Sequence, residues 1–196
     1  VLGKGYAGIV VLAKHRTKKV ALKIRRTDSP RKDMKGETTL LSAANKIGVG
    51  PKLISSSKNF VVMEYISGKK IYDWVEELKG KGSASKLKAV IKKVLTDCYK
   101  LDEAGLDHGE LSNITKHIIV GKSITMIDFE SASLERRASN VTSASQAMLI
   151  GSGLTKLVNR VYTLPPKQKI IDVLRKYKEN RTRQSFDDVL EVLKLA

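Results

Sequence analysis

Short apolar runs separated by polar stretches mark the first third of the chain. The runs at 8–12 and 20–24 flank the basic stretch 14–19, which contains neither Pro nor Gly, and they predict two antiparallel strands. Two further runs, at 53–54 and 60–63, predict two more strands. We therefore expect a strand-rich N-terminal part.

One helix is expected between these two pairs of strands. Between Pro30 and Gly48 the apolar residues keep helical spacing, at Met34, Leu40, Leu41, Ala44 and Ile47. Pro near the beginning and Gly just past the end agree with the usual preferences at the two ends of a helix. The N-terminal part is thus predicted to combine strands with a single helix.

Beyond residue 68 the periodicity becomes mainly helical. A short amphipathic helix is predicted over 71–78 and a longer one over 86–101, with a loop at 80–85 between them. A hairpin of 118–120 with 124–127 interrupts this pattern. Four further helices are expected over 144–150, 153–162, 170–177 and 186–195, the last of them opening on a capping box at 185–188.

The composition suits one domain with one core. The chain has 196 residues, of which 41% are hydrophobic and 29% charged, which is too short for two ordinary domains. Its single cysteine, Cys98, cannot form an intramolecular disulfide, and there is no Cys/His cluster. A disulfide-stabilised secreted protein and a structural zinc site are therefore excluded, and a reducing, cytoplasmic location is expected.

No membrane partner is expected. No apolar run approaches the about 20 residues that a membrane helix requires, and the first residues have neither the apolar stretch nor the cleavage pattern of a signal peptide. The sequence has no initiating Met and begins within a predicted strand, so we expect residues to precede Val1.

The net charge is strongly positive and unevenly distributed. There are 37 Lys and Arg residues against 20 Asp and Glu, a formal net charge of +17. Residues 1–64 carry +10, residues 65–130 carry +1 and residues 131–196 carry +6. The basic stretches 25–32 and 175–183 either serve solubility or bind a polyanion such as RNA or a ribonucleoprotein.

The sequence opens on a glycine-rich motif. Residues 3–10, Gly-Lys-Gly-Tyr-Ala-Gly-Ile-Val, read G-x-G-x-x-G-x-V. In a dinucleotide-binding turn such glycines stand between a strand and a helix, whereas here a second strand follows. Glycines in a strand-turn-strand hairpin let backbone N–H groups close over phosphates without obstruction by side chains, as in the phosphate-covering loop of kinases. A glycine hairpin without a ligand is the alternative interpretation.

Two charged residues after the glycine-rich motif lie where they can bind phosphates and pair with each other. Lys23 ends the stretch Val-Ala-Leu-Lys on the next predicted strand, where an ammonium can reach nucleotide phosphates, and Glu37 lies on the following helix, where it can pair with that ammonium. The apolar strand at 61–66 then runs into a polar linker. This is the arrangement needed for a hinge whose backbone groups form hydrogen bonds with the edge of an adenine. In isolation, this strand would be interpreted as part of the core.

Two carboxylates further along fall in loops. Glu110 follows His108-Gly109 after the long helix, and Asp128 ends the hairpin in the stretch Ile-Asp-Phe-Glu. A carboxylate in each of these places suits a proton acceptor and a Mg²⁺ ligand, respectively. The alternative for each is a solvated acid in a loop.

With these motifs in this order, the sequence resembles the protein-kinase-like superfamily over nearly its whole length. It is most similar to the small atypical branch, namely the RIO-type kinases, the kinase of the tRNA-modifying KEOPS complex and the compact lipopolysaccharide sugar kinases. The resemblance implies an α+β, bilobal kinase-like fold in one domain over 1–196, with a β-rich N-lobe (1–65), a hinge (64–68) and a compact helical C-lobe (69–196). ATP and Mg²⁺ are expected between the lobes.

The resemblance also implies roles for individual residues. Lys23 and Glu37 correspond to the ion pair that holds phosphates, Glu110 stands at the catalytic acid and Asp128 at the metal ligand, while His108 corresponds to a structural pin of the catalytic loop. Nucleotide contacts are implied for Leu2, Gly3, Lys4, Gly5, Tyr6, Gly8 and Val10 in the glycine loop, for Ala21 and Lys23 on the next strand, for Met63, Glu64, Tyr65 and Ile66 at the hinge, and for Ile119 and Ile127 beneath the adenine.

The sequence departs from the family pattern in three ways. Glu110 replaces the usual catalytic Asp, which keeps the charge but moves it by one methylene. The metal-binding Asn expected after it is missing, and Asn113, Thr115 and His117 are the candidates for its place, although an imidazole is a poor ligand for Mg²⁺. Asp-Phe-Glu at 128–130 replaces Asp-Phe-Gly, and no Ala-Pro-Glu follows, so much of the usual peptide platform is expected to be absent.

The resemblance favours an atypical ATP-dependent serine/threonine protein kinase that acts on a protein substrate or on itself. ATP hydrolysis that changes the state of a partner, and phosphorylation of a small molecule such as a sugar, are alternatives within the same machinery. A pseudokinase-like module that docks on RNA or a ribonucleoprotein through its basic surfaces is the alternative from another class.

Overall fold

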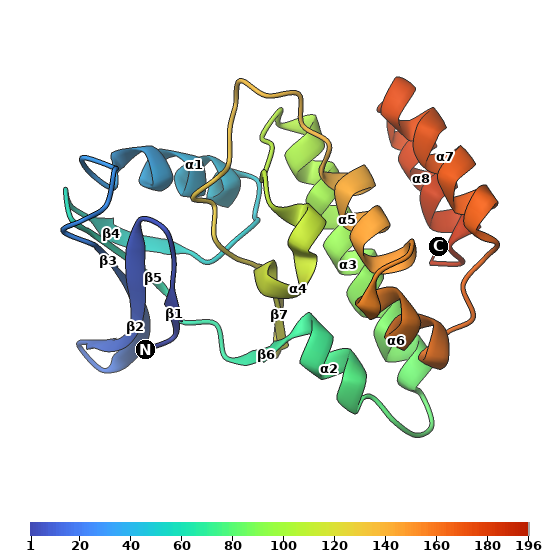
Figure 1. Cartoon of the computed structure of the whole chain (residues 1–196), viewed down its shortest axis with the longest axis horizontal. Coiled ribbons are helices and arrows are strands. Elements are labelled where there is room, and N and C mark those ends of the chain that lie inside the picture. The colour runs from blue at the N-terminus through green and yellow to red at the C-terminus, as the bar shows by residue number, and fades with distance from the viewer. Residues whose placement is uncertain (196) are drawn as a thin grey trace.

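The computed structural model describes residues 1–195 and has two regions that differ in their secondary structure. In Figure 1 a sheet with one helix lies on the left, and a group of helices with a small second sheet lies on the right. This arrangement confirms the predicted α+β class, with a strand-rich N-terminal part and a helical C-terminal part. No helix within residues 1–195 is both long and apolar enough to cross a membrane.

The N-terminal region is built on a five-stranded antiparallel sheet in the order β1-β2-β3-β5-β4. The paired strands β2 and β3 are joined by the two residues Arg16 and Thr17, and Val10 lies opposite Lys23 in their register. All four predicted strands are present, together with the short β1. The five strands are β1 (Gly3–Lys4), β2 (Gly8–His15), β3 (Lys18–Arg25), β4 (Leu53–Ser56) and β5 (Phe60–Glu64).

Helix α1 (Lys35–Lys46) lies beside this sheet and begins five residues later than Pro30 suggested. The preceding segment instead bonds to the β4–β5 connection, where the Met34 N–H donates to the Lys58 carbonyl at 3.0 Å. At the other end of α1 the Asn45 side chain donates to the Val49 carbonyl at 3.1 Å and accepts from the Leu53 N–H at 2.8 Å. This amide therefore ties the helix to the start of β4.

The C-terminal region packs its helices around the long helix α3, whose apolar face is buried as its periodicity predicted. The predicted hairpin is present, and it gains a third strand, β6, which lies outside the predicted elements. The elements are β6 (Gly68–Lys70), α2 (Ile71–Glu77), α3 (Ser83–Glu103), η1 (Leu111–Asn113), α4 (Ile114–His117), β7 (Ile118–Gly121), β8 (Ile124–Met126), α5 (Asn140–Leu149), α6 (Gly153–Val161), α7 (Lys167–Glu179) and α8 (Arg183–Val192).

A buried carboxylate joins three of these helices. Asp102, near the end of α3, accepts hydrogen bonds from the Asn140 N–H and side chain, both at 2.8 Å, and from the Tyr177 hydroxyl at 2.9 Å. Asn140 begins α5, so the negative charge lies where the helix dipole favours it. The full set of bonds lets a carboxylate remain in the core.

Several predicted boundaries in this region were wrong: α5 begins at Asn140 and α7 at Lys167, where residues 144 and 170 were expected. The loop expected at 80–85 ends earlier, because α3 already begins at Ser83. The capping box of the last helix is formed by Thr182 and Ser185, not by residues 185–188: Thr182 Oγ1 accepts from the Ser185 N–H, and Ser185 Oγ accepts from the Thr182 N–H. The cap and the helix therefore both begin about one turn earlier than the apolar pattern indicated.

Phe129 connects the two regions. Its ring is 2% exposed, and its centroid lies 5.0 Å from that of the buried His108 ring in the C-terminal region. On the N-terminal side the ring reaches the turn after α1, where a Cβ built on Gly50 would lie 2.7 Å from Phe129 Cε2 and 3.3 Å from Leu41 Cδ1. Only glycine leaves room for the ring at this place.

Replacing Gly50 by alanine should therefore loosen the junction. Gly50 and Gly80 have nearly the same positive φ, 82° and 84°, but a Cβ on Gly80 meets nothing within 4 Å. Gly80→Ala should lower the free energy of unfolding by about 1 kcal/mol through backbone strain alone. Gly50→Ala should lower it by about 2 kcal/mol more, because the new methyl overpacks against Phe129. Urea unfolding of both variants tests this, and equal losses would contradict the role of Phe129.

Candidate functional site

The site centres on the ammonium of Lys23, which the β2–β3 register places on the central strand of the large sheet. Its Nζ lies 2.7 Å from Glu37 Oε1, 2.7 Å from Glu130 Oε2 and 3.4 Å from Asp128 Oδ1. Lys23 is 3% exposed and Glu37 is 5% exposed. The structure thus brings together the predicted pair of Lys23 and Glu37, and adds carboxylates from the segment after β8.

Burial and ion pairing shift the pKa of Lys23 in opposite directions. Burial by itself disfavours the ammonium, but the Glu37, Asp128 and Glu130 carboxylates outweigh it and raise the pKa of Lys23 above its ordinary value. Burial raises the pKa of Glu37, an effect that the contact with Lys23 opposes. The second oxygen of Glu37, Oε2, has no hydrogen-bond partner within residues 1–195.

Asp128 adopts a backbone conformation that few residues with a side chain adopt. Its φ is 71°, in the left-handed region. Both neighbours are firmly held: the Ile127 N–H donates to the His117 carbonyl at 2.8 Å, and Phe129 is buried. These neighbours impose the strained turn, which aims the 39% exposed Asp128 side chain at Lys23.

Glu130 is a site residue that the sequence reasoning missed, because it was treated only as a departure from the usual Gly. Its side chain is 7% exposed. Oε1 accepts a hydrogen bond from the Ala7 N–H at 3.0 Å, and Oε2 accepts one from Lys23 Nζ at 2.7 Å. Arg31 donates to the Glu130 carbonyl at 2.8 Å, and its guanidinium lies 3.8 Å from Oε1. The signal available in the sequence was a carboxylate two residues after the predicted metal ligand.

The glycine loop lies directly over Glu130. The Gly5 N–H donates to the Gly8 carbonyl at 2.8 Å, which closes the turn between β1 and β2. A Cβ on Gly8 would lie 2.7 Å from the Ile24 carbonyl oxygen, so glycine is needed where the loop meets β3. Of the other loop residues predicted to contact nucleotide, Leu2, Lys4 and Tyr6 are exposed, whereas Gly3 and Val10 are half-buried.

The residues predicted to hold the adenine lie at the junction of the two regions. Ala21, which is buried, pairs with Met63 across β3 and β5, and Tyr65 and Ile66 belong to the connection from β5 to β6. The Glu64 N–H donates to the Lys52 carbonyl at 2.8 Å, whereas the N–H of Ile66 has no hydrogen-bond partner within the described chain. The predicted floor residues are the half-buried Ile119 on β7 and Ile127 just after β8.

The Glu110 carboxylate has a close neighbour at each of its oxygens, but only one of the two forms a hydrogen bond. The Ser131 hydroxyl donates to Oε1, and the Nε2 atom of His117 lies 3.1 Å from Oε2. His117 is 3% exposed. The longer Glu side chain is therefore fixed by the Ser131 hydroxyl, with the His117 ring beside it.

The three candidates for the second metal ligand are placed differently. His117 is directed at Glu110, and the Thr115 hydroxyl donates to Asn113 Oδ1 at 3.2 Å, with Asn113 at the surface. Mg²⁺ prefers carboxylate, phosphate and water oxygens, so Asp128 fits this ion and the His117 imidazole does not. Residues 1–195 contain no group of three or more His, Cys, Asp or Glu side chains that could hold a metal ion by themselves. The metal role assigned to His117 stays a prediction that this placement does not favour.

His108 supports the site from the core. It is fully buried, its Nε2 lies 3.1 Å from the Ile127 carbonyl, and its main-chain N–H donates to Asn140 Oδ1 at 2.9 Å. Burial, with a smaller effect of the neighbouring His117, lowers the pKa of His108 to about 4. The ring is therefore neutral at pH 7 and fixes the backbone next to Asp128.

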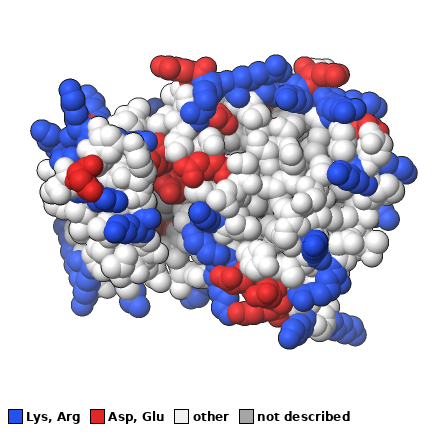
Figure 2. Space-filling view, in the orientation of Figure 1, with Lys and Arg blue, Asp and Glu red and all other residues white. Residues whose placement is uncertain are grey.

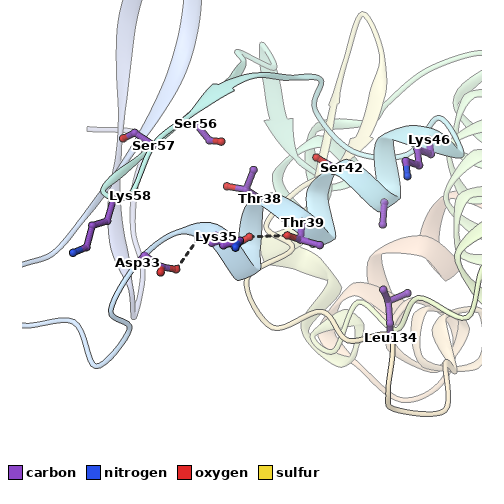
Figure 3. Close-up of a pocket in the computed structure, with 11 residues that line it drawn as sticks. Asp33, Lys35, Thr38, Thr39, Ser42, Lys46, Ser56, Ser57, Lys58 and Leu134 are labelled. Atoms are coloured by element: carbon purple, nitrogen blue, oxygen red, sulfur yellow. Dashed lines mark hydrogen bonds between the residues drawn. The ribbon is translucent and has the colours of Figure 1, made fainter.

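A cavity of about 620 Å³ lies away from these residues, beside α1 (Figure 3). Its walls come from α1, from the connection between β4 and β5, and from Leu134 after the hairpin. None of the predicted site residues lines it. Lysine, serine and threonine side chains dominate the lining that Figure 3 labels.

Comparison with known proteins gives one family match and one relative. A family model described as RIO domain matches residues 11–141, which include Lys23, Glu37, Glu110 and Asp128 and begin just after the glycine loop. An uncharacterized protein of Methanocaldococcus jannaschii, MJ1211, is 31% identical over 91 residues, which are 46% of this chain and 74% of that protein.

The buried His108 predicts a loss of stability in mild acid. An unfolded histidine, with a pKa near 6.5, takes up a proton well before the folded one, whose pKa is about 4, so stability is lost as the pH falls from about 6.5 towards 4. Between pH 7 and pH 5 this linkage should cost about 2 kcal/mol. Urea unfolding of His108→Gln should show a difference in the free energy of unfolding between pH 7 and pH 5 that is smaller than that of the wild type by about 2 kcal/mol. His15→Gln, at an exposed histidine, should behave as the wild type, and an undiminished pH dependence in His108→Gln would contradict the assignment.

Proposed function

The chain belongs to the RIO-domain family of atypical kinase-like proteins, and from this premise we propose that it is an ATP-dependent serine/threonine protein kinase. It would bind Mg-ATP between the two lobes and transfer the terminal phosphoryl group to a hydroxyl of a protein substrate or of the chain itself. The observation that carries the proposal is the buried Lys23 ammonium, paired with Glu37 at 2.7 Å and lying 3.4 Å from Asp128.

The nucleotide would use groups on both sides of the junction. The adenine would lie between Ala21 and Met63 on one side and Ile119 and Ile127 on the other, with the free N–H of Ile66 as a hydrogen-bond donor. The phosphates would lie under the loop 3–8, within reach of Lys23. Mg²⁺ held by Asp128 would neutralise phosphate charge when bound.

Glu110 would receive the proton of the attacking hydroxyl. Its carboxylate is 38% exposed and is oriented by the Ser131 hydroxyl, so it is both reachable by a substrate and fixed in position. Phosphoryl transfer depends mainly on positioning and on charge neutralisation. A glutamate held in this way therefore supports the reaction despite the departure from Asp.

The remaining assignments belong to the same proposal. One kinase-like domain over 1–196, with an N-lobe at 1–65, a hinge at 64–68 and a C-lobe at 69–196, accounts for the change of structure at β6. A cytoplasmic location accounts for the buried free thiol of Cys98. The small-molecule kinase and the ATPase remain alternative outcomes of the test below.

Substitution of Lys23 or Asp128 tests the function. Mg-ATP should raise the unfolding temperature of the wild type, and radiolabel from the γ-phosphate should appear on the protein or on a basic protein substrate. Lys23→Met and Asp128→Asn should each reduce transfer by about 100-fold, because a charge at the phosphates is lost. Lys19→Met removes an exposed lysine from the same strand and should retain full transfer.

The outcomes separate the alternatives. Unfolding temperatures without nucleotide show first whether each variant is folded. Release of inorganic phosphate without labelled protein indicates an ATPase, and a thermal shift without any turnover indicates a binding module. Absence of both shift and transfer in the folded wild type would refute the proposed function.

A second function, RNA binding, is favoured by the basic surface at the C-terminal end. Lys and Arg side chains follow the upper edge of the helical part in Figure 2, towards α7, where Arg175, Lys176 and Lys178 are exposed. The N-terminal basic stretch is less available. Arg25 donates to Asn59, and Arg26 pairs with Asp28.

The α7 surface therefore predicts salt-dependent RNA binding. The double variant Arg175→Ala/Lys178→Ala should weaken binding of a single-stranded RNA and lower the slope of log K against log salt by about 1.4, roughly 0.7 for each lost phosphate contact. The double variant Lys79→Ala/Lys81→Ala has the same charge loss at another exposed place and should keep the wild-type slope. Fluorescence anisotropy at several salt concentrations measures both, and identical slopes would remove α7 as the surface.

A further inference from the structure

The Glu130 side chain makes the contacts of a bound anion. Its two oxygens accept hydrogen bonds from a main-chain N–H of the glycine loop, at Ala7, and from the Lys23 ammonium, at 3.0 and 2.7 Å. The Arg31 guanidinium lies 3.8 Å away. At 7% exposure the carboxylate has exchanged almost all of its water for these groups.

The same set of groups is suited to a phosphoryl group. Backbone N–H groups of a glycine loop, an ammonium and a guanidinium are the usual donors to phosphate oxygens. Glu130 Oε2 also lies against the loop itself, 3.5 Å from the position of a Cβ on Gly5. The space under the loop, where the proposed function puts phosphates, is thus filled by the chain's own carboxylate.

A carboxylate and a phosphoryl group cannot share these donors. Both are oxyanions, and two negative charges at hydrogen-bonding distance from one ammonium repel each other strongly in a buried site. Glu37 and Asp128 already surround Lys23, so the site has no surplus of positive charge to hold a further anion beside Glu130. Phosphate binding requires the Glu130 side chain to leave.

We propose that Lys23, the Ala7 N–H and Arg31 form an anion subsite that Glu130 occupies in the ligand-free protein, and that Glu130 thereby sets the selectivity of the site between adenosine and ATP. The inference rests on the proposed function for the position of the adenine. Adenosine carries no phosphate and binds without displacing Glu130. ATP must displace the carboxylate, and its affinity is lowered by the cost of that displacement.

The Glu130 side chain can leave the subsite without displacing the rest of the site. Its main chain is held through the bond from Arg31 to the Glu130 carbonyl and through the burial of Phe129. The side chain alone can therefore rotate away while the backbone next to Asp128 keeps its conformation. Arg31 remains tied to the carbonyl and stays available to an incoming phosphoryl group.

Affinities of Glu130→Gln and Glu130→Ala for three ligands test the subsite. Isothermal titration calorimetry with adenosine, with Mg-ATP and with tripolyphosphate separates the adenine from the phosphates. Both variants should bind Mg-ATP and tripolyphosphate about tenfold more tightly than the wild type, because a competing charge is removed. Affinity for adenosine should stay within about twofold, since its binding does not involve the subsite.

Glu135→Gln is the matched control. Glu135 is exposed, and it lies in the loop between β8 and α5, so this substitution changes the net charge by the same amount away from Lys23. It should leave all three affinities unchanged. A similar gain in Glu135→Gln would attribute the effect to net charge and overturn the subsite.

The other possible results distinguish failure of the subsite from failure of the proposed adenine pocket. Unchanged or weaker binding of both Mg-ATP and tripolyphosphate by the folded Glu130 variants would overturn the inference while leaving adenosine binding, and with it the proposed function, intact. Tighter tripolyphosphate binding by these variants without any adenosine binding would support the subsite and count against the adenine pocket.

Discussion

A buried ammonium that faces three carboxylates organises this protein. Lys23 comes from the centre of the large sheet, Glu37 from α1, and Asp128 and Glu130 from the segment after β8. An unpaired charge at this depth would be costly, so the sheet, the helix and the hairpin must be in place together. The residues that link the two regions are therefore also those that give the junction its chemistry.

The balance of charge explains why this junction is suited to a nucleotide with a divalent ion. Three carboxylates exceed the positive charge of Lys23, and Arg31 only partly offsets the difference. A cation at Asp128 and the departure of Glu130 would together restore the balance when phosphates enter. The buried phenyl ring of Phe129 and the neutral imidazole of His108 support the same segment from the core, so that Asp128 keeps its left-handed backbone.

The elements with strong periodicity were the ones predicted well. The strands of the N-terminal sheet, the hairpin and the long helix α3 have apolar patterns that burial alone explains. β6 was missed because Gly-Lys-Lys has no apolar signal, and it is a strand only through its pairing with β7. Similarly, the basic residues around Arg25 were expected either to serve solubility or to bind a polyanion, whereas hydrogen bonds to Asn59 and to neighbouring carbonyls engage Arg25 in the fold itself.

The order of the chemical groups could be predicted from local patterns: a glycine hairpin, Lys23 on a strand, Glu37 on a helix, Glu110 after the long helix and Asp128 after a hairpin. That order was enough to indicate the family, because each group stands at a recognisable point of its own local element. Two features could be known only from the packed chain: Glu130 lies under the glycine loop, and the Ser131 hydroxyl holds Glu110 beside the His117 ring. These contacts join residues far apart in the chain, or depend on a strained turn, and local propensity carries no information about either.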